Sequence, residues 1–190
     1  HIIASDGLAT SNVATRVIEV VDNLPPRGGD DSATVVEGAS VLIDLAANDT
    51  DAENKLDLTS IVITTTPTWG SVTVNDDGTV TYTHDGSETI SDTFWYTIRD
   101  LDLNTSSPVP VSITVVPVND LPTAANNTVT TSEDSPYTFT AADFNFSDND
   151  GDSLASVRIT SLESAGSLLL AGTDVALNQA ITRADIDAGK

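Results

Sequence analysis

Short runs of alternating apolar and polar residues recur along the chain, and turn-forming residues separate them. The clearest example is the turn Asn75–Gly78, which lies between two alternating runs. Alternation on both sides of such a turn predicts a β-hairpin. The same pattern predicts seven strands between residues 31 and 116, a number typical of an immunoglobulin-like Greek-key sandwich. The expected strands are Ser32–Val36, Ser40–Leu45, Leu58–Thr65, Ser71–Val74, Thr79–Thr83, Thr93–Arg99 and Val109–Val116.

The pattern then repeats. A β-branched run occurs at Val20–Pro25 and again at Val115–Pro122. Each run ends in two polar residues, which are followed by a leucine and a proline. Leu24 and Leu121 in these runs are 97 residues apart (121 − 24), a spacing typical of one small β domain. The sequence therefore predicts an all-β chain of tandem Greek-key sandwiches. Four further pairs keep a spacing of 96 residues: Glu37 and Glu133, Ile63 and Ile159, Gly70 and Gly166, and Ser71 and Ser167.

These junctions predict three parts. Residues 1–24 carry the last two strands of a preceding repeat and a linker, residues 25–120 form a complete repeat, and residues 121–190 form a repeat that stops before its final strands. In the last part, Thr182–Asp185 followed by Gly189 predicts a single helical turn. The strands expected before it are Thr128–Thr131, Tyr137–Ala141, Ala155–Ser161, Ser167–Leu170 and Val175–Ile181.

A sandwich without its final strands exposes apolar core residues and open sheet edges. One hypothesis is that the N-terminal strands of one copy complete the last repeat of another copy by strand exchange. The other is that these ends are arbitrary boundaries and that the last repeat is partly disordered. The sequence leaves both open.

Charge restricts the partners. The chain has 29 acidic and 7 basic residues and a net charge of −22, which disfavours nucleic acid and anionic membrane surfaces. No apolar run approaches the roughly 20 residues of a membrane span. The absence of cysteine excludes disulfides and thiolate metal sites. Cations are the natural partners of such a surface, and a simply solvated acidic surface is the alternative.

The acidic residues gather in loops. The densest groups are Asp148–Asp152 and Asn48–Asn54. Calcium takes six to eight oxygens, and the alternating carboxylates of Asp148, Asp150 and Asp152 can converge on one point. The loop is not an EF-hand, because Gly151 is at its fourth position and Ile159, at its twelfth, cannot supply a bidentate carboxylate. Asx turns with solvated carboxylates are the alternative.

These features together resemble a known family. The junction Asn119–Pro122, the early-strand Glu37 and Glu133, and the Asp-x-Asp loops resemble the cadherin-like tandem repeats of large bacterial surface proteins. The stretches Tyr82–Phe94 and Gly166–Gly189 are similar to the related CSPG-type repeats. The resemblance covers nearly the whole chain. It implies cadherin-like sandwiches at the cell surface, with calcium as the bound ion.

In cadherins, calcium lies between successive repeats, and the resemblance implies the ligands here. The chain lacks the Leu-Asp-Arg-Glu motif, for which Asp85 with Glu88 is a loose substitute, so one or two ions per junction are expected. For the second junction the implied ligands are Glu37, Asn119 and Asp120 with Asp148 and Asp150, and for the first they are Asp22 and Asn23 with Asp49 and Asp51. Asp100 and Asp102, in the loop before the last strand, are further candidates.

Catalysis is not expected. The chain has no nucleophilic cysteine for which His84, beside Asp85, could act as a general base. A narrow sandwich also has no deep cleft for a substrate. We therefore expect His84 to cap a loop. The hypothesis is an extracellular spacer or adhesion repeat stiffened by calcium. Its partners would be neighbouring repeats of the same or identical chains, and surface glycans or proteins. A filament subunit formed by strand exchange is one alternative. A carbohydrate-binding module is another, with Trp69 exposed and Trp95 packed in the core.

Overall fold

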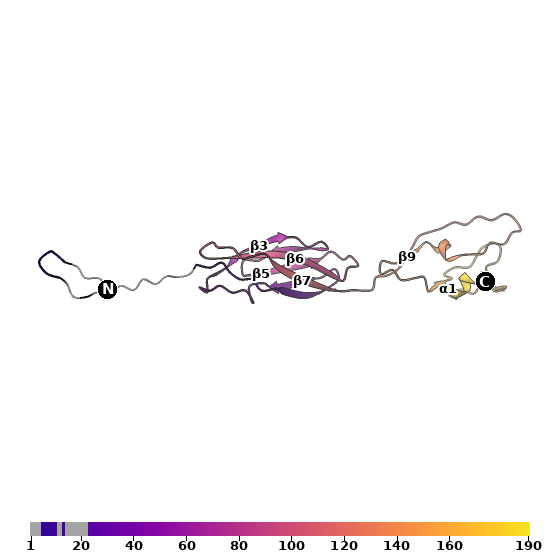
Figure 1. The fold of residues 1–190 in the computed structure, drawn as a ribbon. Coiled ribbons are helices and arrows are strands. Elements are labelled where there is room, and N and C mark those ends of the chain that lie inside the picture. The colour runs from indigo at the N-terminus through magenta and orange to yellow at the C-terminus, as the bar shows by residue number, and fades with distance from the viewer. Residues whose placement is uncertain (1–4, 11–12, 14–22) are drawn as a thin grey trace. The chain divides into compact units, whose positions relative to one another are not determined.

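The computed structural model describes residues 5–10, 13 and 23–190. The chain divides into two compact units, unit 1 with residues 1–116 and unit 2 with residues 117–190 (Figure 1). Almost all of the regular structure is β, which confirms the predicted fold class. The two strands expected in residues 1–24 lie largely outside the described residues, and the described part there holds one isolated bridge, between Ser5 and Thr10.

Unit 1 is a sandwich of two sheets. One sheet has the strand order β1-β7-β6-β3 and the other has the order β2-β5-β4. All seven strands predicted between residues 31 and 116 are present, with small differences in their bounds. They are β1 (Asp31–Val36), β2 (Ser40–Asp44), β3 (Leu56–Thr65), β4 (Gly70–Val74), β5 (Thr79–His84), β6 (Ser91–Asp100) and β7 (Val109–Val116).

The predicted hairpin joins β4 to β5. Val74 pairs with Val80 across the turn, and Asp77 Oδ1 accepts a hydrogen bond from the Thr79 amide at 3.1 Å. Gly78 has a φ of +87°, a backbone conformation that glycine adopts without steric cost. A Cβ at this position would also lie 2.8 Å from the Ala46 side chain, so the turn requires glycine on both grounds.

Buried and exposed side chains alternate along the strands of unit 1, and the buried ones form its core. In β6, for example, Phe94, Tyr96 and Ile98 are fully buried while Trp95 between them is 38% exposed. Successive side chains of a strand point to opposite faces, so one face of each sheet packs inward. The prediction that Trp95 packs in the core is therefore wrong, because Phe94 occupies the inward position.

The register defines two ends of this sandwich. β1 and β7 are parallel, with Asp31 opposite Val111 and Val36 opposite Val116. The end that contains Asp31 is called the N-terminal end of unit 1, and the end that contains Val36 and Val116 is called its C-terminal end. β6 runs antiparallel to β7, so it begins at the C-terminal end and reaches the N-terminal end at Asp100.

Unit 2 is built from shorter elements. Its strands form three two-stranded pairs, β8 with β9, β10 with β13, and β11 with β12. The elements are β8 (Thr123–Ala124), the 3₁₀ helix η1 (Ala141–Phe144), β9 (Phe146–Ser147), β10 (Ser156–Arg158), β11 (Leu169–Leu170), β12 (Thr173–Asp174), β13 (Ala180–Thr182) and the helix α1 (Arg183–Asp187). No helix among the described residues has the length and apolar character needed to cross a membrane.

Several expectations for unit 2 need correction. No strand forms at Thr128–Thr131 or Tyr137–Ala141, and η1 begins within the second of these ranges. β propensity depends on a neighbouring strand to pair with, and these segments have none here. The strand expected at Val175–Ile181 is also wrong, because a turn with Asn178 at a φ of +66° occupies most of the range and β13 begins only at its end.

The predicted helical turn is confirmed. Thr182 is the N-cap of α1, and its Oγ1 accepts a hydrogen bond from the Asp185 amide at 3.2 Å. The Thr182 hydroxyl also donates to Asp185 Oδ2 at 2.7 Å. This pairing satisfies one of the free amides at the start of the helix, as an N-cap does.

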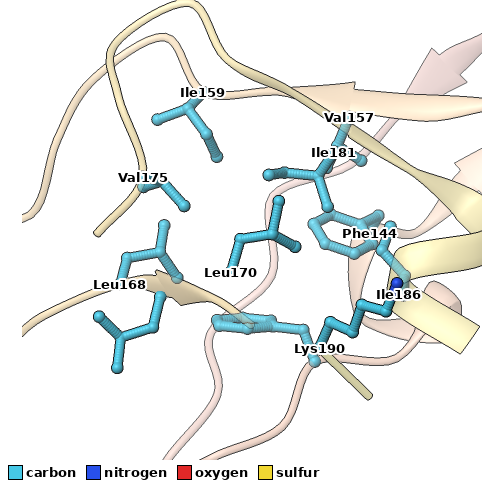
Figure 2. A pocket seen from close by; sticks show the side chains of 11 residues that line it. Phe144, Val157, Ile159, Leu168, Leu170, Val175, Ile181, Ile186 and Lys190 are labelled. Atoms are coloured by element: carbon cyan, nitrogen blue, oxygen red, sulfur yellow. The ribbon is translucent and has the colours of Figure 1, made fainter. Parts of the chain in front are cut away.

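An apolar groove opens in unit 2. Figure 2 shows side chains that reach toward a common space from the strands around it and from α1. In unit 1, β6 and β7 supply seven of the thirteen buried core residues found in the described chain. In unit 2 the buried core is smaller, with four apolar residues. Its lining includes Phe144, Val157, Ile159, Leu170, Val175 and Ile181.

Candidate metal centres

Acidic and amide side chains meet at the N-terminal end of unit 1. Asn104 Nδ2 donates to Asp100 Oδ2 at 2.7 Å and to Asn23 Oδ1 at 3.0 Å, which ties the linker residue to the end of β6. The Asn104 amide also donates to Asp100 Oδ1 at 2.8 Å. Burial of Asp100 would by itself raise its pKa, but these hydrogen bonds to the carboxylate hold the pKa below its usual value.

Asp51 has an unusual environment. Its residue is 8% exposed, and its Oδ2 accepts hydrogen bonds from the amides of Glu53 at 3.0 Å and Lys55 at 2.9 Å. Its Oδ1 is buried and has no hydrogen-bond partner among the described residues. A buried carboxylate oxygen without a partner costs free energy, more than a neutral group would. A bound cation would remove this cost.

Asp102 lies in the loop next to that of Asp51. The Leu101 amide donates to the Lys55 carbonyl at 2.9 Å, which joins the two loops. Lys55 Nζ contacts Asp102 Oδ2 at 3.1 Å, and this hydrogen bond and charge raise the pKa of Lys55. Both side chains are partly exposed, so the pair is weak and exchangeable. Asp102 is thus paired with a positively charged side chain of the protein, Lys55.

Asp49 turns toward the core. Tyr96 Oη donates toward Asp49, with distances of 2.9 and 3.0 Å to the two carboxylate oxygens, and the Gly29 amide donates to Asp49 Oδ1 at 2.8 Å. Burial raises the pKa of Asp49. The neighbouring Asp31 also accepts from Tyr96, at 3.1 Å, and burial raises its pKa to about 6. These contacts give Asp49 a structural role, which its Asp-x-Asp spacing did not reveal. Asp22, its predicted linker partner, lies outside the described residues.

Two glutamates face each other at the C-terminal end of unit 1. The Glu37 amide donates to the Val116 carbonyl at 3.0 Å, so Glu37 lies where the chain leaves the sandwich. Carboxylate oxygens of Glu37 and Glu88 lie within 4.8 Å of each other. Asp85 instead accepts hydrogen bonds within its own turn, from the Ser87 amide and hydroxyl. Glu88 was not among the predicted ligands, although its position three residues after Asp85 made it a candidate.

In unit 2 the linker contacts the acidic loop. The Asp120 amide donates to Asp150 Oδ2 at 2.6 Å, and Asn149 Nδ2 donates to Asp120 Oδ2 at 2.9 Å. The predicted residues Asp120 and Asp150 are therefore neighbours, and Asn149 is an additional member of the group. Asn119 Nδ2 donates to the Asp120 carbonyl at 2.7 Å.

The loop itself is a backbone turn, in which the Asp148 carbonyl accepts a hydrogen bond from the Gly151 amide at 3.3 Å. Asp148 Oδ1 accepts from the Asp152 amide at 3.2 Å, and Gly151 has a φ of +80°. The Asp150 carboxylate contacts the linker, and both Asp150 and Asp152 are exposed to solvent. A partly hydrated calcium ion tolerates such an exposed set of oxygens.

The carbohydrate alternative rests on Trp69, which is 41% exposed.

The comparisons with known proteins define the class. Residues 23–117, which are half of the chain, match the family model of the bacterial cadherin-like domain. Residues 119–185 match the model of the bacterial Ig domain. The protein belongs to the bacterial cadherin-like domain family. More particularly, it carries a cadherin-like domain followed by an immunoglobulin-like domain, and such domains are typical of extracellular surface proteins.

Solved structures with some likeness were also found, and no curated protein matched. The SrpA adhesin from Streptococcus sanguinis is 17% identical with a TM-score of 0.38, covering 65% of this chain and 68% of that chain. A mutant of it is 18% identical with a TM-score of 0.36, covering 51% and 58%. An endo-fucoidan hydrolase from glycoside hydrolase family 107 is 17% identical with a TM-score of 0.37, covering 61% and 18%. No function follows for this chain at these similarities.

Proposed function

We propose that this chain is a calcium-binding extracellular repeat module, which serves as a spacer or adhesion segment of a larger surface protein and carries out no catalysis. Cadherin-like domains generally bind calcium, and the acidic loops of both units suit a divalent cation that prefers oxygen ligands. The single observation that carries the proposal is the buried Oδ1 of Asp51, which lacks a partner among the described residues.

At the N-terminal end of unit 1, Asp51 would supply the central carboxylate. Asn23 and Asp100 lie at the same end and offer further oxygens, and Asp102 adds a carboxylate now paired with Lys55. Asp22 completes the proposed set from the linker. Asp49 accepts hydrogen bonds from the Gly29 amide and the Tyr96 hydroxyl, so its role is to hold the loop in place.

Two other groups are proposed as calcium ligands. Glu37 and Glu88 form the first, at the C-terminal end of unit 1. Asp120 and Asp150 form the second, in unit 2, with Asn119, Asp148 and Asp152 around them. Asp120 is four residues after Val116 in the chain (120 − 116), so the linker is short. The sharing of one ion across this linker stays a prediction of the sequence.

The mechanism is charge neutralisation. A net charge of −22 destabilises compact arrangements of acidic loops through repulsion. An ion that binds only the folded state stabilises that state. The stabilisation grows with the logarithm of the ratio of the ion concentration to the dissociation constant. At millimolar calcium, as outside cells, the loops at each linker would be ordered and the linker stiffened.

The test is calorimetry of the 190-residue chain in chelator and in millimolar calcium, with a titration to count ions. We expect calcium to raise the melting temperature of unit 1, and Asp51→Asn to remove most of that increase. Asp134→Asn is the matched control, because Asp134 is an exposed turn residue whose φ of +61° suits asparagine. A wild-type melting temperature that does not respond to calcium would contradict the proposal.

The apolar groove of unit 2 favours a second candidate function. Strands added from a neighbouring copy would cover the groove and pair its open edges, which would join copies into a filament. Light scattering with electron microscopy tests this candidate. Association that increases with concentration and is lost on removal of residues 1–21 supports it, and a monomer at all concentrations contradicts it.

A further inference from the structure

His84 is almost completely buried, at 2% exposure, at the C-terminal end of unit 1. Its Nδ1 accepts hydrogen bonds from the amides of Gly38 and Gly86, each at 3.2 Å. A ring nitrogen that accepts two N–H groups carries no proton, so the proton of the neutral ring is on Nε2. Nε2 therefore donates to Thr89 Oγ1 at 3.0 Å. One imidazole thus bonds to two separate loops.

The two loops held by His84 carry the two facing glutamates. Gly38 follows Glu37 directly, and Gly86 precedes Glu88 by two residues. The loops lie against each other, because a Cβ on Gly38 would be 3.9 Å from the Gly86 Cα. The His84 amide also donates to the Ala39 carbonyl at 3.0 Å, which fixes β5 to the first loop.

Holding these loops together opposes an electrostatic force. Glu37 and Glu88 bring like charges within 4.8 Å of each other, and this repulsion favours separation of the loops. The imidazole itself is buried, so salt screens its hydrogen bonds less than it screens the repulsion between the carboxylates. His84 can therefore keep the two carboxylates close before any ion is present.

We propose that His84 is a positioning residue, which preorganises the Glu37 and Glu88 carboxylates as a ligand pair for a divalent cation. This inference rests on the proposed calcium function and adds a residue that contacts no ion itself. Preorganisation lowers the cost of binding, because the ion does not have to bring the two loops together. Residues that orient metal ligands typically change metal affinity about tenfold or more when replaced.

The test uses three variants of the full 190-residue chain in a background of Asp51→Asn and Asp150→Asn, which removes a central ligand from each of the two other proposed sites. His84→Leu removes all ring hydrogen bonds. His84→Asn keeps an acceptor near the position of Nδ1. Thr89→Val removes only the partner of Nε2 and keeps the side-chain shape. Amide exchange of Gly38 and Gly86 in chelator reports on the loops, and calcium titration reports on the site.

For His84→Leu we expect about tenfold faster exchange of both amides and about tenfold weaker calcium binding at this site. We expect His84→Asn to recover most of both losses and Thr89→Val to show a smaller change in the same direction. If His84→Leu does not fold, Thr89→Val alone decides. Faster exchange with unchanged calcium affinity overturns the inference, and so does unchanged exchange. A wild-type chain that binds no calcium refutes the proposed function instead, and the exchange data then still show whether His84 holds the loops.

Discussion

Unit 1 and unit 2 follow the same sequence pattern at a spacing of about 96 residues, yet only unit 1 is a closed sandwich. In unit 1 the inward side chains of β6 and β7 supply more than half of the buried core. Unit 2 retains only four buried apolar residues in its described core, Leu154, Val175, Ile181 and Ile186. The strands of unit 1 have five to ten residues and those of unit 2 have two or three, so the same alternating pattern goes with long strands where the buried core is large and with short strands where it is small.

The largest expected effect comes from removing a side chain that closes unit 1. Phe94→Ala in β6 should lower the free energy of unfolding of unit 1 by about 3–5 kcal/mol, because it leaves a cavity among fully buried residues. Both tryptophans are in unit 1, so their fluorescence during urea unfolding reports on this unit alone. Thr93→Ala, an exposed position of the same strand, is the control and should change the free energy by less than about 1 kcal/mol. An equal loss in both variants would show that β6 does not close the core.

Asp92 provides the next largest effect, through hydrogen bonds rather than packing. Its buried carboxylate accepts from the amides of Thr68, Trp69 and Thr93 and from the Tyr82 hydroxyl. Burial by itself raises the pKa of Asp92, but these donors together lower it. Asp92→Ala should cost unit 1 about 3 kcal/mol, because several buried donors lose their acceptor.

The same urea experiment measures this loss, with Asp92→Asn as the conservative variant. Because the folded pKa of Asp92 is depressed, its contribution is present above the ordinary pKa and is lost as the pH falls below it. A pH-independent difference between wild type and Asp92→Asn from pH 7 down to pH 3 would contradict this role.

In unit 2 the expected effects are smaller, because less is buried. Thr182→Ala removes the N-cap of α1 and should cost about 1 kcal/mol. Scanning calorimetry should show this as a shift of the transition of unit 2 alone, since unit 1 does not contain the helix. Thr182→Ser keeps the hydroxyl and should restore the transition, and a shift in the transition of unit 1 would contradict the division into two units.

The smallest effect is a pH dependence at the N-terminal end of unit 1. Burial raises the pKa of Asp31 to about 6, so the folded state disfavours its ionised form. Its contribution to stability is therefore fully present below the unfolded pKa and is lost as the pH rises through about 6. In chelator, Asp31→Asn should melt at the same temperature as wild type near pH 4 and slightly above it at pH 7. Parallel melting profiles across this range would contradict the assignment.

Much of unit 1 could be predicted from the sequence. The turn at Asn75–Gly78 and the alternation in β5 and β6 identified the hairpin and the sandwich, because turn chemistry and period-two burial are local properties. The capped turn at Thr182 was predictable for the same reason. The absent strands near Thr128 and Tyr137 were not, because their formation depends on a pairing partner elsewhere in the chain.

The candidate site was predictable only in part. The resemblance to cadherin-like repeats implied that Asp120 and Asp150 lie together, and the clustering of acidic residues placed Asp51 in an acidic loop. It could not show that Asp49 faces Tyr96, since that depends on which side of the loop packs on the core. It also could not pair Glu37 with Glu88, which are 51 residues apart (88 − 37) and meet only through the sheet register.

The parallel pairing of β1 with β7 has a mechanical consequence. The chain enters β1 at Asp31 and leaves β7 at Val116, at opposite ends of this ladder. Tension along the chain therefore pulls β1 and β7 in opposite directions along their length, and all six residue pairs from Asp31–Val111 to Val36–Val116 carry the load together. Such a shear-loaded ladder ruptures as a whole, so its lifetime under force is set by one high barrier to unfolding.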